Sequence, residues 1–286
     1  MTATIRPDQI AERLRTAGCI FAEDEAAVLI EAGCDPRPGR SLTELLNRRL
    51  SGEPLEQVVG WASFAGLRIA VRPGVFVPRA RTALLARLAL RAARFWPAPV
   101  LLDLCCGSGA VAAVVAAALP TAELWATDID PAAVACARVN LPGAAVVVLG
   151  DLFAPLPILL QGRIGVIVAN APYVPTAAIE TMPGEARDHE PRRALDGGVD
   201  GVAVHRRIAT AAGDWLAPGG MLLLESSYHQ RRLTADALRE NDFRVRTWYD
   251  ADLEATVVIG RDPGHRHSRP AAGWRTPPPA RSPVSS

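Results

Sequence analysis

The stretch LLDLCCGSG at residues 101–109 decides the fold, because it is an apolar run that leads directly into a glycine-rich turn. An Ala-rich stretch with helical character, Val111–Leu119, follows the turn. Gly107 and Gly109 lack a Cβ, so the backbone there can adopt positive φ and approach a ligand closely. The pattern predicts a strand, a ligand-binding turn and a helix in succession. Many sheets turn on a G-x-G, so the neighbouring strands must indicate the ligand.

Six further short apolar stretches have the length and composition of buried strands. Helical sequence separates most of them, and this alternation predicts a parallel sheet with helices on both faces. The last two have only a short turn between them, so we expect an antiparallel pair at one edge. The fold class is therefore α/β, Rossmann-like, with a mostly parallel sheet. The seven predicted strands are Val100–Leu104, Leu124–Thr127, Ala145–Leu149, Ile164–Ala169, Met221–Glu225, Arg244–Tyr249 and Thr256–Gly260.

The α/β region is one of four segments that composition and spacing predict. A helical domain precedes it, a connector with Gly and Pro between short apolar stretches joins the two, and a tail rich in Pro, Arg and Ser follows. Such a tail cannot bury enough apolar area to order itself. The segments are residues 1–52 (helical domain), 53–80 (β-hairpin connector), 81–262 (α/β domain) and 263–286 (tail).

Helical spacing of apolar residues, such as Ile10 and Leu14, defines the first segment. Ser41 and Glu44 form a capping-box pattern at the start of a further helix. Two interpretations stay open for this segment. It is either a plain helical bundle or a cap that docks a substrate.

The charge balance disfavours nucleic acid as a partner. The net charge is +1, and the last 24 residues contribute four Arg and no acid, so the rest of the chain has 27 basic against 30 acidic residues, or −3. All 31 basic residues are Arg, so a single arginine is weak evidence for a phosphate contact. A nucleic-acid binder typically has a basic excess.

Cysteine usage and hydropathy indicate a cytoplasmic protein without a metal site. The five cysteines are scattered, with no C-x-x-C spacing, so neither a zinc site nor a disulfide framework is expected. Reduced thiols fit a cytoplasm. No apolar run reaches the roughly 18 residues that span a bilayer. Residues 1–16 carry charges throughout and lack the apolar core of a signal peptide.

Acidic residues stand at the ends of three predicted strands. Asp103 precedes the glycine turn, and Asp128 ends the next strand, where a carboxylate can accept hydrogen bonds from ribose hydroxyls. A dinucleotide is an alternative ligand, since G-x-G-x-x-A is also satisfied, but Asp103 would repel its pyrophosphate. A cationic sulfonium with an amino group suits the acids better. Asp151 is placed to receive an adenine amino group, with Leu152 beside the ring.

The tetrad Asn170-Ala171-Pro172-Tyr173 follows another buried strand, so it is expected at the same sheet edge. Asn170 can accept one N–H of a planar NH2 group through its side-chain oxygen, and the carbonyl of Ala171 can accept the other. Both bonds strengthen as the nitrogen becomes positive during alkylation. Pro172 biases residue 171 toward an extended backbone, and Tyr173 offers a flat face. No strong general base is required.

These motifs resemble the protein N5-glutamine methyltransferases, which modify release factors or a ribosomal protein. More distantly, they are similar to the amino-methyltransferases of DNA and RNA. The resemblance covers roughly residues 53–261 and implies S-adenosylmethionine as cofactor, the tetrad as catalytic site, and Glu190 as support for the loop that follows it. The implied cofactor-binding residues are Asp103, Cys105, Cys106, Gly107, Ser108, Gly109, Asp128, Asp151, Leu152 and Asn170.

Three departures from the family pattern bear on substrate choice and turnover more than on reaction type. Ala171 replaces a proline, so the loop has more conformational freedom, which is expected to cost about 0.4–1 kcal/mol of stability. Cys105 replaces a usual glycine, which narrows the turn. Residues 80–83 lack the acids typical of the family.

Three hypotheses follow for the function. The first is methylation of a glutamine side chain in a release factor or ribosomal protein. The second is methylation of an adenine or guanine amino group in nucleic acid. The third is cofactor binding with lost turnover. In each case residues 174–200, which hold Pro, Gly and charge, are expected to form a lid over the substrate.

Overall fold

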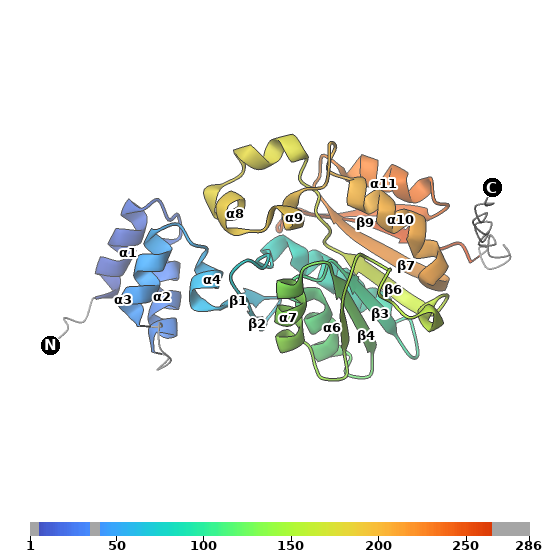
Figure 1. Cartoon of the computed structure of the whole chain (residues 1–286), viewed down its shortest axis with the longest axis horizontal. Helices are drawn as coiled ribbons and strands as arrows, with labels where there is room; N and C mark the ends of the chain where they lie inside the picture. The colour runs from blue at the N-terminus through green and yellow to red at the C-terminus, as the bar shows by residue number, and fades with distance from the viewer. Residues whose placement is uncertain (1–5, 35–40, 265–286) are drawn as a thin grey trace, which may run out of the picture.

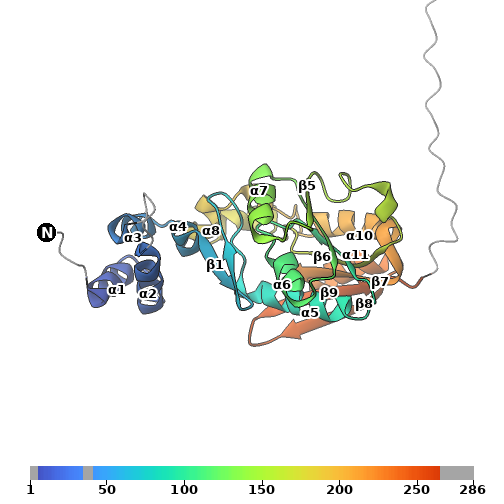
Figure 2. The same cartoon turned by 90° about the horizontal axis from the view of Figure 1, so that it is seen from below.

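The computed structural model describes residues 6–34 and 41–264 (Figure 1). Almost all of the predicted tail, including His265 and His267, lies outside the described residues. A small group of helices stands at one end of the molecule and the large sheet at the other, as two perpendicular views agree (Figure 1, Figure 2). Within the described ranges, no helix is long and apolar enough to cross a membrane.

The large sheet has seven strands in the order β5-β4-β3-β6-β7-β9-β8. The first five in this order are parallel, and β9 runs antiparallel to both of its neighbours. The predicted fold class and the antiparallel edge pair are thus confirmed. The strands are β3 Val100–Leu104, β4 Glu123–Asp128, β5 Val146–Leu149, β6 Ile164–Ala169, β7 Leu216–Ser226, β8 Arg244–Asp250 and β9 Ala255–Arg261.

One strand differs from its expected bounds. β7 begins at Leu216 rather than Met221, so it contains the Pro218-Gly219-Gly220 sequence that is typical of a turn. The register shifts there, because Ile164 pairs with Leu216 while Val166 pairs with Met221. A bulge absorbs the extra residues, with Gly219 at φ 81°.

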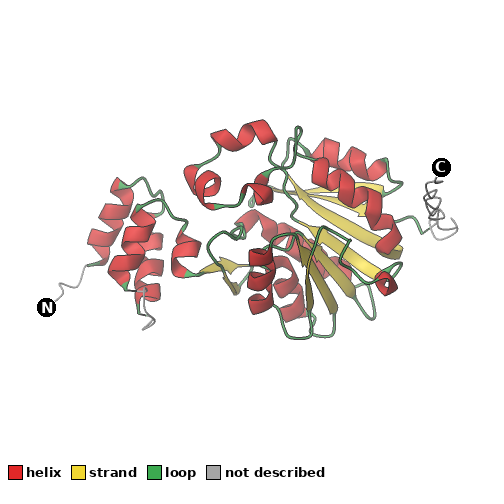
Figure 3. Ribbon diagram, viewed as in Figure 1, coloured by secondary structure: helices red, strands yellow, loops and turns green. Residues whose placement is uncertain are grey.

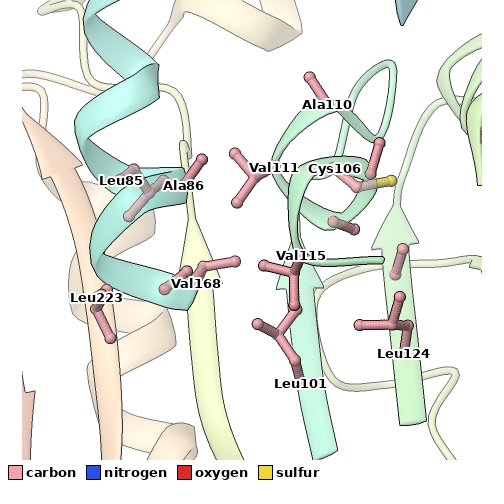
Figure 4. Close-up of a cluster of buried hydrophobic side chains, with 14 of the residues drawn as sticks. Leu85, Ala86, Leu101, Cys106, Ala110, Val111, Val115, Leu124, Val168 and Leu223 are labelled. Carbon is pink, nitrogen blue, oxygen red and sulfur yellow. The ribbon is translucent and has the colours of Figure 1, made fainter. Parts of the chain in front are cut away.

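Helices cover both faces of the sheet (Figure 3). Alternate residues of a strand point to opposite faces. Leu101 accordingly packs in the core beneath α5 and α6, whereas Leu102 packs in the core beneath α10 and α11. Figure 4 shows the first core, where Leu85 of α5 and Val115 of α6 lie over the strands. The covering helices are α5 Ala83–Ala93, α6 Ala110–Ala118, α7 Pro131–Asn140, α10 Ala203–Trp215 and α11 Arg231–Arg239.

The N-terminal helices form a core of their own, and the predicted hairpin follows it. The capping box is confirmed, since the Glu44 N–H donates to Ser41 Oγ at 3.3 Å and the Ser41 N–H donates to Glu44 Oε2 at 3.1 Å. Val58 and Val59 join this core from beyond residue 52. The segment boundaries themselves stay predictions. The elements are α1 Pro7–Thr16, α2 Ala22–Gly33, α3 Leu42–Leu50, α4 Leu55–Val59, β1 Trp61–Phe64 and β2 Leu67–Ala70.

Short elements complete the described chain. Three of them follow the tetrad and arch over the carboxyl ends of the strands, beside the N-terminal helices (Figure 1). Arg49 of α3 pairs with Glu185 of this arch at 2.7 Å. The short elements are η1 Ala80–Thr82, η2 Ile158–Leu160, η3 Thr176–Thr181, α8 Gly184–His189 and α9 Arg192–Leu195.

Asn140, the last residue of α7, joins the hairpin to the glycine turn. Its Oδ1 accepts from the Ala70 N–H at 2.8 Å, and its Nδ2 donates to the carbonyl oxygens of Ala70 at 2.9 Å and Ser108 at 2.8 Å. One side chain therefore satisfies three backbone groups from two distant segments.

We expect Asn140→Ala to lower the free energy of unfolding by about 1–3 kcal/mol, because it leaves these partly buried backbone groups unsatisfied. Chemical denaturation measures the change. The control is Asn47→Ala, the same substitution at an exposed position of α3, which should stay within about 0.5 kcal/mol of wild type. Equal effects of the two variants would contradict the assignment.

Candidate active site

Parallel pairing brings the carboxyl ends of three strands to one edge of the sheet. Leu104 of β3 lies opposite Thr127 of β4 and Ala169 of β6. The residues that follow these positions, Cys105, Asp128 and Asn170, therefore meet although the sequence separates them widely. This is the edge at which open α/β sheets bind ligands.

A cleft opens at this edge, with about 780 Å³ of space including the part open to solvent. We call it the main cleft. Its walls come from the glycine turn, the end of β4, the tetrad and the segment around Phe76. The site residues predicted from sequence that lie in its wall are Asp103, Cys105, Cys106, Gly107, Ser108, Asp128, Asn170 and Pro172.

The glycine turn and the end of β4 hold each other in place. The Gly107 N–H donates to Asp128 Oδ2 at 2.9 Å, and the Asp130 N–H donates to Asp128 Oδ1 at 2.9 Å. Cys105 adopts φ 54°, in the left-handed region, at a cost of about 1–2 kcal/mol relative to glycine. The turn therefore keeps the backbone shape of a glycine position despite the cysteine.

Gly109 has a packing role beside the cleft. It caps α6 with φ 76°, and a Cβ there would lie 3.1 Å from that of Ala137. It is not in the described wall of the main cleft. Its lack of a side chain lets α6 and α7 approach each other.

Asp103 is a buried carboxyl in the wall of the main cleft, with 2% of its surface exposed. Burial raises its pKa from 3.8 to about 7, and the nearby charge of Asp128 adds to this increase. The Ala112 N–H, which donates to Asp103 Oδ2 at 3.2 Å, acts in the opposite direction. A cation in the cleft would favour the ionised form.

Asp151 and Leu152 are not brought into the described wall of the main cleft. Asp151 is exposed enough to pair with Arg207 of α10 at 2.6 Å. Leu152 is buried in the core under α10, and its carbonyl accepts from the Thr127 hydroxyl at 3.0 Å. That the two contact an adenine stays a prediction.

The structure adds wall residues that sequence reasoning missed. Ile129 is 57% exposed and lines the main cleft directly after Asp128. The signal available in the sequence was an apolar residue between two acids, Asp128 and Asp130, at a strand end. Phe76 also lines the cleft, from a segment distant in sequence.

A second, smaller cavity of about 380 Å³ adjoins the tetrad, and we call it the side pocket. Ala171 and Tyr173 line it, together with Arg79 and Arg81. Asn170 lies in the walls of both cavities. The tetrad thus stands between a larger and a smaller chamber.

A hydrogen bond to Glu225 of β7 holds the side chain of Tyr173. Its hydroxyl donates to Glu225 Oε1 at 3.3 Å, and burial, followed by the charge of Glu225, raises the pKa of Tyr173. Tyr173 is therefore a neutral phenol, not a base. It presents an aromatic surface to the side pocket.

The backbone of the tetrad is held by a glycine-rich loop at residues 197–201. The side-chain amide of Gln230 donates to the carbonyls of Tyr173 at 2.7 Å and Asp200 at 2.9 Å. A Cβ on Gly201 would lie 2.4 Å from the Tyr173 carbonyl oxygen, and one on Gly197 would lie 2.8 Å from that of Pro172. Only glycine permits this close approach.

Glu190 fastens the segment that enters η1. Its Oε1 accepts from the Val77 N–H at 3.1 Å and from Arg79 Nη2 at 2.7 Å. Burial raises its pKa, and Arg79 opposes that shift. Across the described residues, no cluster of three His, Cys, Asp or Glu side chains could hold a metal ion.

The strand order, the antiparallel β9 and the glycine turn with its strand-end acids define the class I S-adenosylmethionine-dependent methyltransferase fold. The family model "Methyltransferase small domain" matches residues 66–189. A solved T. thermophilus 16S rRNA N2 G1207 methyltransferase shares the fold, with a TM-score of 0.52, 22% identity and coverage of 71% of this chain and 49% of that one.

Relatives narrow the class. A release factor glutamine methyltransferase from Moorella thermoacetica is 34% identical over 82% of this chain and 83% of its own, and one from Geobacter sulfurreducens is 41% identical over 63% of each chain. A Streptomyces pristinaespiralis enzyme named 4-amino-L-phenylalanine/4-methylamino-L-phenylalanine methyltransferase is 38% identical over 65% of each chain. The chain belongs to the family of release factor glutamine methyltransferases.

Replacing Asp103 should stabilise the protein in the absence of ligand. Because the folded-state pKa is about 7, the buried carboxyl destabilises the fold increasingly as pH rises from about 4 to above 7. We expect Asp103→Asn to raise the free energy of unfolding at pH 8 by up to about 4 kcal/mol, with a much smaller gain at pH 4. Denaturation at several pH values measures this.

The matched control is Asp252→Asn, which changes an exposed carboxylate in the turn before β9. Its effect on stability at each pH is the baseline from which the gain of Asp103→Asn is measured. A gain for Asp103→Asn that is the same at pH 4 and pH 8 would refute the electrostatic account.

Proposed function

We propose that this chain transfers a methyl group from S-adenosylmethionine to the side-chain amide nitrogen of a glutamine in a peptide chain release factor. One observation carries the proposal: Asn170 lies in the walls of both the main cleft and the side pocket. A group on that residue can therefore contact a donor in one chamber and an acceptor in the other. The names of the relatives supply the acceptor class.

The main cleft suits this cofactor. Asp103 can hold its amino group, and the remaining lone pairs of Asp128, beyond those that accept backbone N–H groups, can take the ribose hydroxyls. Ile129 offers an apolar surface to the adenine ring. When bound, S-adenosylmethionine supplies an activated methyl on a positively charged sulfur.

The tetrad holds the acceptor nitrogen. Asn170 Oδ1 and the Ala171 carbonyl accept its two N–H groups, and both hydrogen bonds gain strength as positive charge develops on nitrogen. The flat face of Tyr173 orients the amide plane. Positioning and charge stabilisation account for most of the expected rate enhancement, because an amide nitrogen is a weak nucleophile and the methyl is already activated.

The helical domain is the proposed docking element for the protein substrate. The Arg49–Glu185 ion pair joins α3 to the arch over the site, which supports a docking role for this domain. A ribosomal protein is the second protein acceptor to test. A nucleic-acid acceptor has less support, given the charge of −3 for residues 1–262.

A small aromatic amine is a second candidate acceptor. The relative from Streptomyces pristinaespiralis is named for methylation of 4-amino-L-phenylalanine, an NH2 group whose lone pair is delocalised like that of an amide. The same two acceptors, on Asn170 and Ala171, would hold it. The side pocket, with Arg79 and Arg81 in its wall, could also take a carboxylate.

Asn170→Ala should lower the rate of methyl transfer by about 10²-fold or more, because it removes an acceptor that acts most strongly in the transition state. Transfer of labelled methyl into a purified release factor measures the rate, with a ribosomal protein extract and free 4-amino-phenylalanine as parallel acceptors. Asn47→Ala is the control and should match wild type.

Methylated glutamine in the release factor, lost in Asn170→Ala, supports the proposal. Transfer only to the aromatic amine would show that the acceptor is this small molecule, with the methyl-transfer chemistry as proposed. Cofactor binding with no transfer to any acceptor would show that turnover is lost. A variant as active as wild type would remove Asn170 from the reaction.

A further inference from the structure

We infer that the buried carboxylate of Glu225 is a positioning residue for the tetrad, acting on Asn170 through the hydroxyl of Thr82 and on Tyr173 directly. The inference deepens the proposed function and rests on it. Glu225 of β7 and Thr82 of η1 set the direction in which Asn170 presents its oxygen.

The three groups form a connected chain beneath the site. Glu225 is 1% exposed and Thr82 is 3% exposed. Asn170 Nδ2 donates to Thr82 Oγ1 at 3.3 Å, and the hydroxyl of Thr82 lies near enough to the Glu225 carboxylate to lower the pKa of that acid. The Tyr173 hydroxyl donates to Glu225 Oε1 at 3.3 Å. One carboxylate therefore connects two side chains of the tetrad.

The direction of donation along this chain follows when Glu225 is ionised, the form that burial opposes and the nearby guanidinium of Arg81 favours. An ionised carboxylate can only accept, and a threonine hydroxyl has one proton to donate. With that proton directed to Glu225, Thr82 Oγ1 can only accept, and the NH2 group of Asn170 is its donor. The oxygen of the Asn170 amide is left to face the two chambers, as the proposed reaction requires.

The opposite amide orientation is disfavoured on both sides. It would place Asn170 Oδ1 against the lone pairs of Thr82 Oγ1 and would turn two N–H groups toward the NH2 of the acceptor. Donors facing donors cannot hold the acceptor nitrogen, so an amide free to rotate would spend part of its time in a non-productive state. Glu225 thus does not contact the reacting atoms and acts on Asn170 through Thr82.

Arg81 supplies the countercharge for this carboxylate. Its Nε lies 3.8 Å from Glu225 Oε1, and its side chain is about half-exposed. Among the described residues, the other oxygen of Glu225 is buried and has no hydrogen-bond partner. A buried acid with an unused oxygen is costly to the fold. A positioning role in the reaction explains why an acid stands here.

Thr82→Val tests the chain, because valine keeps the shape of threonine but can neither accept nor donate. We expect kcat to fall about 10- to 100-fold through mispositioning, with a smaller change in the KM for the acceptor and little change in cofactor affinity. Thr82→Ser, which restores a hydroxyl, should recover most of the kcat. Thr210→Val, an exposed position on α10, is the matched control.

Glu225→Gln provides a second variant. Its amide can donate to Thr82, which would then donate to Asn170 Oδ1 and reverse the orientation. We expect a loss of kcat similar to that of Thr82→Val. Unchanged kcat in folded Thr82→Val, or no recovery in Thr82→Ser, overturns the inference.

A spectroscopic measurement keeps the inference testable apart from activity. The chain has four asparagines, Asn47, Asn140, Asn170 and Asn241, so ¹⁵N-asparagine labelling gives a simple set of side-chain NH2 signals. One Asn170 proton should exchange slowly in wild type and quickly in Thr82→Val, while those of Asn140 stay unchanged. Equal exchange in the two proteins overturns the inference, whereas inactivity of wild type toward every acceptor overturns only the proposed function.

Discussion

The pairing of β3 between β4 and β6 is the constraint on which the site depends. Two parallel ladders in register force Asp128 and Asn170 to emerge beside the glycine turn, on one edge of the sheet. No short-range interaction could gather these residues, because they belong to separate strand–helix units. A slip of one residue in either ladder would direct these side chains to the opposite face. The geometry of the candidate site is thus a consequence of backbone hydrogen bonding among β3, β4 and β6.

Buried acids recur around this edge, and each works against the stability of the empty protein. Asp103 faces the main cleft, Glu225 lies under the tetrad, and Glu190 fastens the segment that enters η1. Burial raises the pKa of all three. Glu190 and Glu225 have arginine partners, whereas Asp103 faces the space where a cationic ligand would bind. The protein therefore holds unfavourable electrostatic energy at the position where a positive charge is expected.

Much of the fold could be predicted from sequence, because β3 and β6 are apolar apart from Asp103 and end in recognisable turns. The N-cap of α7 was also readable, because Asp130 stands directly before Pro131. In the structure Asp130 Oδ1 accepts from the Ala132 N–H at 2.9 Å. The β7 bulge was not readable, since Pro218 and two glycines have the composition of a turn and only tertiary pairing makes them strand. Residues that act through long-range contacts were missed for a related reason. Thr82 and Glu225 have no spacing that links them, and only the folded sheet places them together.

The position of Asn170 on the partition between the two chambers has a consequence for inhibitor design. A single compound that fills the main cleft and continues past this residue into the side pocket would contact more wall than a ligand confined to either chamber. Joining the two halves makes the second binding event intramolecular, which can raise affinity by about 10²–10⁴ over the separate pieces. Phe76 and Ala194 border both chambers as well, so the linker between the halves would have to be slim and partly apolar.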